Sequence, residues 1–332
     1  MESRIACDST SLGAAAGVIY CAGMRPVVAV DLGGTNIRAA YYPRGTPPAV
    51  RSSRRATGAG DGPTAVLERI HAAIEDLALS APEAEAMIIG IGAPGPLDPA
   101  TGVVHHAPNL PGWHEVPLGE MLSRRWGCPV KVENDANLAA LGEWGHGSGR
   151  GAHHLILLTI GTGIGGGVIV DDRLVRGWRG LGGELGHLPL VADGPRCSCG
   201  QAGHLEAIAS GTAIARAYRQ VGGGPADGPA ITTERIAAAA RAGDPRAKAV
   251  FNDAADAIGR GLSGLVHVFN PERVLLGGGV VRAGEWFTGH VERALRESLM
   301  DATFGEGLQV LPAELGDEAA LLGALTLVTS DA

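Results

Sequence analysis

Residues 26–41 have the sequence PVVAVDLGGTNIRAAY, in which two apolar runs flank a glycine-rich turn. The first run, Pro26–Val30, is continuous and rich in β-branched residues, which is typical of a buried strand. The second run, Ile37–Tyr41, predicts another strand. Between them lies Asp31-Leu32-Gly33-Gly34-Thr35-Asn36, so the segment predicts a strand, a tight turn and a returning strand.

A second segment has the same organisation. Residues 155–158 (LILL) lead into TIGTGIGGG at 159–167, and the apolar run Val168–Val170 follows. Residues 31–35 and 159–163 therefore occupy equivalent places in two strand–turn–strand units. We expect two structurally similar lobes, each beginning with such a hairpin.

The remaining segments alternate between strand and helix patterns, which indicates an α/β class. Strands are expected at residues 87–91, 130–132, 272–276 and 308–311, and helices at 64–79, 136–144, 206–219, 232–241, 245–269, 285–299 and 318–328. Gly145–Gly151, rich in Gly and Ser, is the best candidate for a linker.

The length of 332 residues exceeds what a single hydrophobic core usually supports. We expect a small α/β lobe made of residues 25–140 and 316–332. Residues 141–315 are expected to form a large α/β lobe. Residues 1–24 are expected to be a disordered N-terminal extension.

Charge and hydropathy exclude several classes of protein. The net charge of -8 argues against a general nucleic-acid binder or a membrane-surface binder, because both partners are anionic. No run of 18 or more apolar residues is present, so we expect no membrane span. The mildly apolar Leu12–Met24 lacks the basic flank and cleavage site of a signal peptide. A cytoplasmic location follows as an expectation.

Three glycine bends are candidates for binding phosphates, because glycine lets backbone N–H groups approach an anion closely. They are the turn Asp31–Thr35, the turn Gly161-Thr162-Gly163 and the strand end Gly277-Gly278-Gly279. Each alone is most simply a tight turn between strands. Three such bends together favour a nucleotide site, where Asp31 and Thr35 would hold Mg²⁺ through water.

Other nucleotide-binding folds fit less well. A P-loop needs lysine directly after glycine, and the two lysines of the chain, Lys131 and Lys248, follow valine and alanine. A dinucleotide fingerprint must open a helix, whereas residues 161–167 open a strand.

A metal site is predicted from the Cys197-Ser198-Cys199 segment together with His187 and His204. Two thiolates and two imidazoles make a closed tetrahedral set, which is typical of a structural Zn²⁺ site. The alternative is a chance grouping of surface side chains. The other three cysteines are isolated in the sequence and are expected to be inert thiols.

Taken together, these motifs resemble the ROK family (repressors, open reading frames and kinases) of the actin-like, hexokinase-type superfamily. The resemblance extends from about Arg25 onward. It rests on residues 31–36 (DLGGTN), 92–95 (GAPG), 109–113 (NLPGW), 133–137 (ENDAN), 161–165 (GTGIG), 184–187 (ELGH) and 197–203 (CSCGQAG). One position departs from the family pattern, which has a third cysteine where this chain has His204.

The resemblance implies a two-lobed actin-like ATPase (ribonuclease H-like) fold with a central cleft. It further implies a hexose kinase that uses ATP and Mg²⁺, with glucose as the preferred sugar. Asp135 corresponds to the aspartate that takes the proton from the attacking sugar hydroxyl, a role that an ionised carboxylate can fill. From the residues alone, Asp135 could equally cap the helix that follows it.

The resemblance also implies which residues contact the sugar. They are Asn109, Asn134, Glu184, His187 and Glu206, and carboxylates suit the task because each can accept hydrogen bonds from two hydroxyls. His187 would bind zinc through one ring nitrogen and reach the sugar with the other. Zinc would then organise the loop that carries Glu206 without acting as a Lewis acid.

Several alternatives stay open at this point. Fructose, mannose or an N-acetylated amino sugar could replace glucose. The family also contains sugar-responsive transcriptional regulators, but these carry a helix-turn-helix domain, for which the roughly 25 residues before the first strand are too few. A sugar-binding protein without activity is the third alternative. A homodimer or homotetramer is expected from the resemblance.

Overall fold

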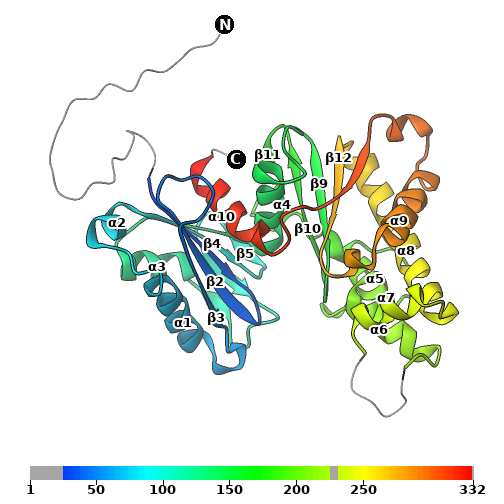
Figure 1. Cartoon of the computed structure of the whole chain (residues 1–332), viewed down its shortest axis with the longest axis horizontal. Coiled ribbons are helices and arrows are strands. Elements are labelled where there is room, and N and C mark those ends of the chain that lie inside the picture. Colours follow the sequence, from blue (N-terminus) through cyan, green and yellow to red (C-terminus); the bar gives the residue numbers. More distant parts are fainter. Residues whose placement is uncertain (1–24, 225–230, 331–332) are drawn as a thin grey trace, which may run out of the picture.

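The computed structural model describes residues 25–224 and 231–330, and two five-stranded sheets form its framework. Figure 1 shows the arrangement of these elements. The first sheet has the strand order β3-β2-β1-β4-β8, and the second has the order β11-β10-β9-β12-β13. The strands of the first sheet are β1 (Val27–Leu32), β2 (Asn36–Tyr42), β3 (Arg51–Ala56), β4 (Ile88–Ala93) and β8 (Val130–Asn134). Those of the second are β9 (Leu155–Ile160), β10 (Ile164–Val170), β11 (Arg173–Leu174), β12 (Arg273–Gly277) and β13 (Gln309–Pro312). We call the halves built on them the first lobe and the second lobe.

The two sheets repeat one topology. β1 pairs antiparallel with β2 and parallel with β4, and β9 pairs antiparallel with β10 and parallel with β12. The glycine turns lie at the ends of the β1–β2 and β9–β10 hairpins. The prediction of two similar lobes that each begin with a hairpin is confirmed.

Helices cover the sheets and fill the space between them. The helices of the first lobe are α1 (Pro63–Glu75), α2 (Ala81–Ala86) and α3 (Leu118–Trp126). Those of the second lobe are α5 (Leu205–Ala209), α6 (Gly211–Gln220), α7 (Thr233–Arg241), α8 (Pro245–Phe269) and α9 (Glu285–Glu297). The remaining two helices, α4 (Asp135–His146) and α10 (Ala319–Thr329), lie between the sheets (Figure 1). Their apolar side chains join both sheets in one buried cluster that includes Leu138, Leu157 and Leu325.

One predicted helix is in fact two. The sequence pattern predicted a single helix over residues 206–219, but α5 ends at Ala209 and α6 begins at Gly211. Ser210 between them has an extended backbone, and its hydroxyl accepts a hydrogen bond of 3.2 Å from Ala213 N. Serine competes for backbone hydrogen bonds in this way, so it starts the second helix.

The chain crosses between the sheets twice, and one buried carboxylate contacts both crossings. The first crossing, residues 147–154, follows α4, which extends two residues beyond its predicted end at Trp144. The second, residues 313–318, leads back into α10. Glu143 of α4 accepts hydrogen bonds from Ser148 N (3.0 Å) and Leu315 N (2.7 Å). The crossings are therefore held together where the lobes join.

A small three-stranded sheet borders the space between the lobes. It consists of β5 (Leu97–Asp98), β6 (Val103–His106) and β7 (His114–Val116), and the loop between its last two strands carries Asn109. Within the described ranges, none of the helices has the length and apolarity needed to cross a bilayer. The expected extension at residues 1–24 lies outside the described residues.

Candidate active site

The Asn134–Asp135 pair lies where β8 of the first sheet passes into α4. Asn134 is the N-cap of that helix, since its Oδ1 accepts hydrogen bonds from Ala136 N (2.9 Å) and Asn137 N (3.2 Å). Asp135 is the first helical residue, and its Oδ1 accepts from Ala136 N at 2.8 Å. Capping is thus performed by Asn134, and the Asp135 side chain lines a cavity.

The surroundings of Asp135 shift its proton affinity. Burial, and next the nearby charge of Asp31, raise the pKa of Asp135 to about 6, against an opposing hydrogen bond from Ala136 N. The sequence alone suggested an ordinary carboxylate with a pKa of about 3.9. At neutral pH Asp135 is still mostly ionised, and it accepts a proton more readily than an exposed aspartate does.

The cavity has a volume of about 640 Å³ and is lined by both lobes. All the side chains predicted to contact the sugar line it: Asn109, Asn134, Asp135, Glu184, His187 and Glu206. Five residues predicted to hold the nucleotide also line it: Asp31, Gly161, Thr162, Gly163 and Gly278. The structure thus brings the Asn-Asp pair and the second and third glycine bends to one cavity.

A second cavity of about 400 Å³ adjoins the first and is lined by the third glycine bend, Gly277, Gly278 and Gly279. Thr159 and Gly278 border both cavities. Gly278 has φ +90°, and a Cβ there would collide with the carbonyl oxygen of Ile160. Glycine is therefore needed where the third bend packs against the end of β9.

Residues 33–36 of the first glycine turn lie next to a residue of the first cavity but are not part of its described lining. Gly33, Gly34, Thr35 and Asn36 are absent from the described lining of either cavity. A Cβ placed on Gly34 would nevertheless lie 3.3 Å from the Cβ of Asn109, which does line the first cavity. The turn itself is held by Thr57, whose hydroxyl donates to Gly33 O at 2.6 Å.

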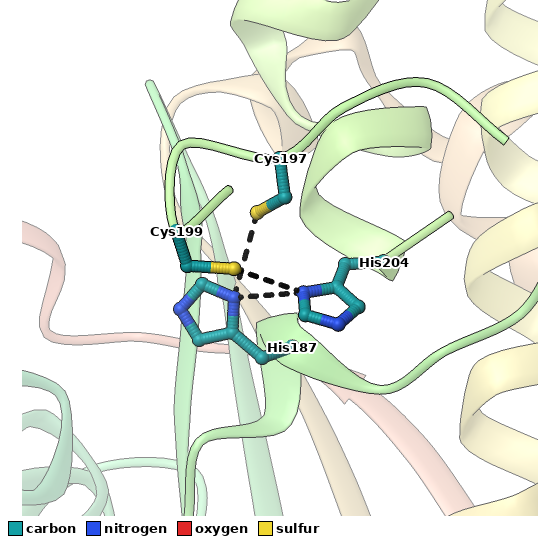
Figure 2. Close-up of side chains that lie close together, drawn as sticks. All are labelled: His187, Cys197, Cys199 and His204. Atoms are coloured by element: carbon teal, nitrogen blue, oxygen red, sulfur yellow. Dashed lines mark hydrogen bonds between the residues drawn. The ribbon is translucent and has the colours of Figure 1, made fainter. Parts of the chain in front are cut away.

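The four predicted metal ligands lie together, as Figure 2 shows. One potential ligand atom from each of His187, Cys197, Cys199 and His204 lies within 4.8 Å of all the others. The Nδ1 atoms of the two histidines are 3.3 Å apart. Cys197 Sγ lies 3.5 Å from His187 Nδ1, and Cys199 Sγ lies 3.3 Å from His204 Nδ1.

The N–N distance and the two N–S distances are close to those around a tetrahedral ion. Zn–N bonds of about 2.0–2.1 Å and Zn–S bonds of about 2.3 Å would separate two nitrogens by about 3.3 Å and a nitrogen from a sulfur by about 3.5 Å. The donor set, two thiols and two imidazoles, suits Zn²⁺ as well. His204 contributes a nitrogen at the position where the family pattern has a cysteine.

The metal cluster adjoins the cavity, since His187 and Cys197 of the cluster also line it. His187 directs Nδ1 to the cluster, while its Nε2 lies 4.0 Å from Glu184 Oε2. Ser198, between the two cysteines, donates a hydrogen bond of 2.9 Å to Glu206 Oε1. Burial, partly offset by the charge of His187, raises the pKa of Glu184. A bound ion would therefore fix two residues of the cavity wall.

Arg38 is a partner of Asp31 that was not predicted from the sequence. Its Nη2 lies 2.6 Å from Asp31 Oδ2, and its Nε donates to the same oxygen at 3.2 Å. The two residues face each other across the β1–β2 hairpin. The hairpin register was readable from the sequence, so this partner of Asp31 could have been predicted.

Comparisons with known proteins agree with this geometry. The model of the ROK family matches residues 27–331. A glucokinase of Thermotoga maritima is 38% identical over 314 residues, which cover 91% of this chain and 96% of the relative. A ROK hexokinase structure from Thermus thermophilus has a TM-score of 0.77 at 39% identity and covers 91% of this chain and 97% of its own.

A third relative was solved with ligands. The ROK family glucokinase from Streptomyces griseus, in complex with glucose and AMPPNP, has a TM-score of 0.77 at 35% identity. The match covers 91% of this chain and 98% of that one. The two-lobed actin-like fold expected from the sequence is confirmed by these likenesses.

Proposed function

This chain belongs to the ROK family, and we propose that it is a glucokinase-like sugar kinase that transfers the γ-phosphoryl group of ATP to glucose. One observation carries the proposal. A single cavity is lined by Asp135, by the glycine turn at 161–163 and by the acidic residues Glu184 and Glu206. A base, a place for phosphates and acceptors for sugar hydroxyls thus surround one space.

In the proposed reaction Asp135 accepts the proton of the attacking sugar hydroxyl while the oxygen bonds to the γ-phosphorus and ADP leaves. The raised pKa, about 6, supports this role because the carboxylate is ionised at neutral pH and still basic. Most of the rate acceleration would come from aligning the two substrates. Mg²⁺ would neutralise the phosphoryl oxygens, and the Asp31 carboxylate would hold the ion through water.

The sugar would be held by hydrogen bonds from polar side chains of both lobes. Asn109 and Asn134 come from the first lobe, and Glu184, His187 and Glu206 come from the second. Carboxylates can each accept from two adjacent hydroxyls, and buried polar acceptors discriminate strongly against sugars that leave them unpaired.

We assign the nucleotide to the glycine bends. The second turn is held by the start of α6, where Gly211 N donates to Gly161 O at 2.8 Å and the Thr212 hydroxyl donates to Thr162 O at 2.8 Å. Residues 33–36, next to Asn109, and residues 277–279, in the adjoining cavity, would complete the site. Zn²⁺ at His187, Cys197, Cys199 and His204 would stabilise the wall that carries His187 and Glu206.

Other functions are less well supported. Kinases of fructose, mannose or N-acetylated amino sugars would need the same base and the same turns, so substrate choice rests on the glucokinase relatives. The hypothesis of a sugar-responsive regulator is less well supported, because the glucokinase relative matches over nearly its whole length and is named as an enzyme.

The test is a coupled ADP-release assay with ATP, Mg²⁺ and a panel of hexoses. We expect the highest kcat/KM with glucose, and no ADP release when the sugar or Mg²⁺ is omitted. Absence of turnover with every sugar would reject the kinase. Turnover with another hexose at much higher kcat/KM than with glucose would retain the kinase and reject glucose as its substrate.

A further inference from the structure

A buried ion pair connects the two lobes directly behind the active site. Glu133 precedes Asn134 in β8, and its side chain is 0% exposed. Arg176 Nε donates a hydrogen bond of 2.6 Å to Glu133 Oε2. Glu133 Oε1 accepts two more hydrogen bonds, from Asn134 N at 2.9 Å and from Asn137 Nδ2 at 3.0 Å. The carboxylate is thus paired at both oxygens, as a buried charge requires.

Arg176 belongs to the second lobe, where it opens the loop that leads to Glu184. It lies two residues after β11. The loop closes on itself, because Gly182 N donates to Arg176 O at 2.8 Å. Gly183 comes next, and a Cβ there would lie 3.3 Å from Asn137 Oδ1. The arginine therefore anchors the base of the loop that carries a cavity residue.

Both partners act from outside the cavity. Asn134, Asp135, Gly183 and Glu184 line it, whereas Glu133 and Arg176 are not among the described residues that do. One end of the ion pair contacts the backbone that carries the Asn-Asp pair. The other end contacts the loop that carries Glu184. The ion pair thus spans the distance between the base and a proposed sugar ligand that belongs to the opposite lobe.

We propose that Glu133 and Arg176 are positioning residues. They hold the Asn134–Asp135 pair and Glu184 at a fixed position relative to each other, so that the pair and Glu184 bind the same sugar. This inference rests on the proposed kinase function. Replacing a buried ion pair with apolar side chains is often neutral or stabilising, so stability alone does not account for a charged connection at this place. Arginine suits it because its planar fork fixes direction as well as charge.

The proposal predicts a specific kinetic pattern. Arg176→Ala, Arg176→Lys and Glu133→Gln should each lower kcat and raise the KM for glucose, by about tenfold to a hundredfold, because small displacements of catalytic groups cost that much. The KM for ATP should stay at the wild-type value, since the hydrogen bonds of Glu133 described above go to Arg176, Asn134 and Asn137 and not to the glycine bends. Guanidinium at a non-denaturing concentration should partly restore kcat in Arg176→Ala, because it can fill the space beside Glu133.

Arg55→Met provides the matched control. Arg55 Nε also lies 2.6 Å from a carboxylate, Asp76 Oδ2, but that pair is exposed, and neither residue is in the described cavity lining. This variant should keep the wild-type kcat and both KM values. Thermal melting of all variants separates positioning from folding. If Arg176→Ala does not fold, Arg176→Lys and Glu133→Gln carry the same kinetic test.

Two results would overturn the inference. One is a lowered melting temperature with unchanged kcat and glucose KM, which would make the pair merely structural. The other is an equal rise in the KM values for glucose and ATP, which would indicate a general loss of order. If the wild-type protein phosphorylates no hexose, the proposed function fails instead. Calorimetric binding of glucose to wild type and Arg176→Lys then tests the pair by itself, and equal affinity would contradict it.

Discussion

The backbone amide of Ile164 donates a hydrogen bond of 3.0 Å to Glu206 Oε2. Ile164 follows the second glycine turn directly, and a Cβ on Gly163 would collide with the Glu206 carboxylate. The other oxygen of Glu206 accepts from Ser198, which stands between the two cysteines of the metal cluster. One carboxylate therefore contacts both the proposed phosphate turn and the proposed zinc loop.

Replacing Glu206 by glutamine should weaken glucose binding. The amide keeps an oxygen for Ile164 N but loses the charge and one acceptor. Hydrogen bonds to charged groups contribute about 1.5–3 kcal/mol, so the glucose KM should rise about tenfold to a hundredfold. Steady-state kinetics with varied glucose measures this, with Glu292→Gln on the surface of α9 as the control. An unchanged glucose KM would remove Glu206 from the sugar site.

The purified protein should contain one zinc ion per chain, held by the cluster in Figure 2. Cys197→Ser should lose the metal, lower the melting temperature and raise the glucose KM, because the loop around Ser198 and Glu206 loses its anchor. Cys128→Ala removes a buried cysteine of the first lobe and should keep the zinc. Zinc content that is equal in both variants would contradict the assignment.

The rate should fall in acid as Asp135 becomes protonated. Only the carboxylate can accept the sugar proton, so kcat/KM should decline below an apparent pKa of about 6, by roughly tenfold per pH unit. Asp31→Asn removes a like charge that raises this pKa, so the midpoint should move to lower pH even as the rate drops. A wild-type midpoint near the ordinary aspartate value of about 4 would show that the site leaves the base unperturbed.

Gly161→Ala tests the close approach of phosphate to the second turn. A Cβ at Gly161 meets no protein atom within 4 Å, so the fold should tolerate the change. A phosphate bound against the turn would meet the new methyl group, and the ATP KM should rise while the glucose Kd stays constant. Gly264→Ala in α8, where a Cβ likewise meets nothing, is the control and should change neither value. An ATP KM that is equal in both variants would place the phosphates elsewhere.

Local patterns made much of the fold predictable. The two hairpins were found because apolar runs and glycine turns are adjacent in sequence. β3 was missed because its sequence, RSSRRA, has no apolar alternation, as suits an edge strand exposed to solvent. The strands β5, β6 and β7 are too short to form a pattern. The break at Ser210 was hidden because apolar residues continue on both sides of it.

The site was predictable where its residues form motifs and unpredictable where packing joins distant segments. The metal cluster was predictable because its two cysteines and two histidines lie close together in the sequence and are typical zinc ligands. The Glu133–Arg176 pair joins residues 43 positions apart, one in a strand of the first sheet and the other in a loop of the second lobe. No local pattern encodes it, because it depends on how the lobes pack. The raised pKa of Asp135 could not be predicted either, because burial and the charge of Asp31 cause it and both depend on the fold.

The most direct test of the account compares wild type with Asp135→Asn, measuring glucose 6-phosphate formation and glucose binding side by side. The amide keeps the shape of the side chain but cannot accept the proton. We predict that kcat falls by about 10²- to 10⁴-fold, as loss of a general base usually causes, while the Kd for glucose changes little. A variant that forms glucose 6-phosphate at the wild-type rate would contradict the central claim that Asp135 is the base.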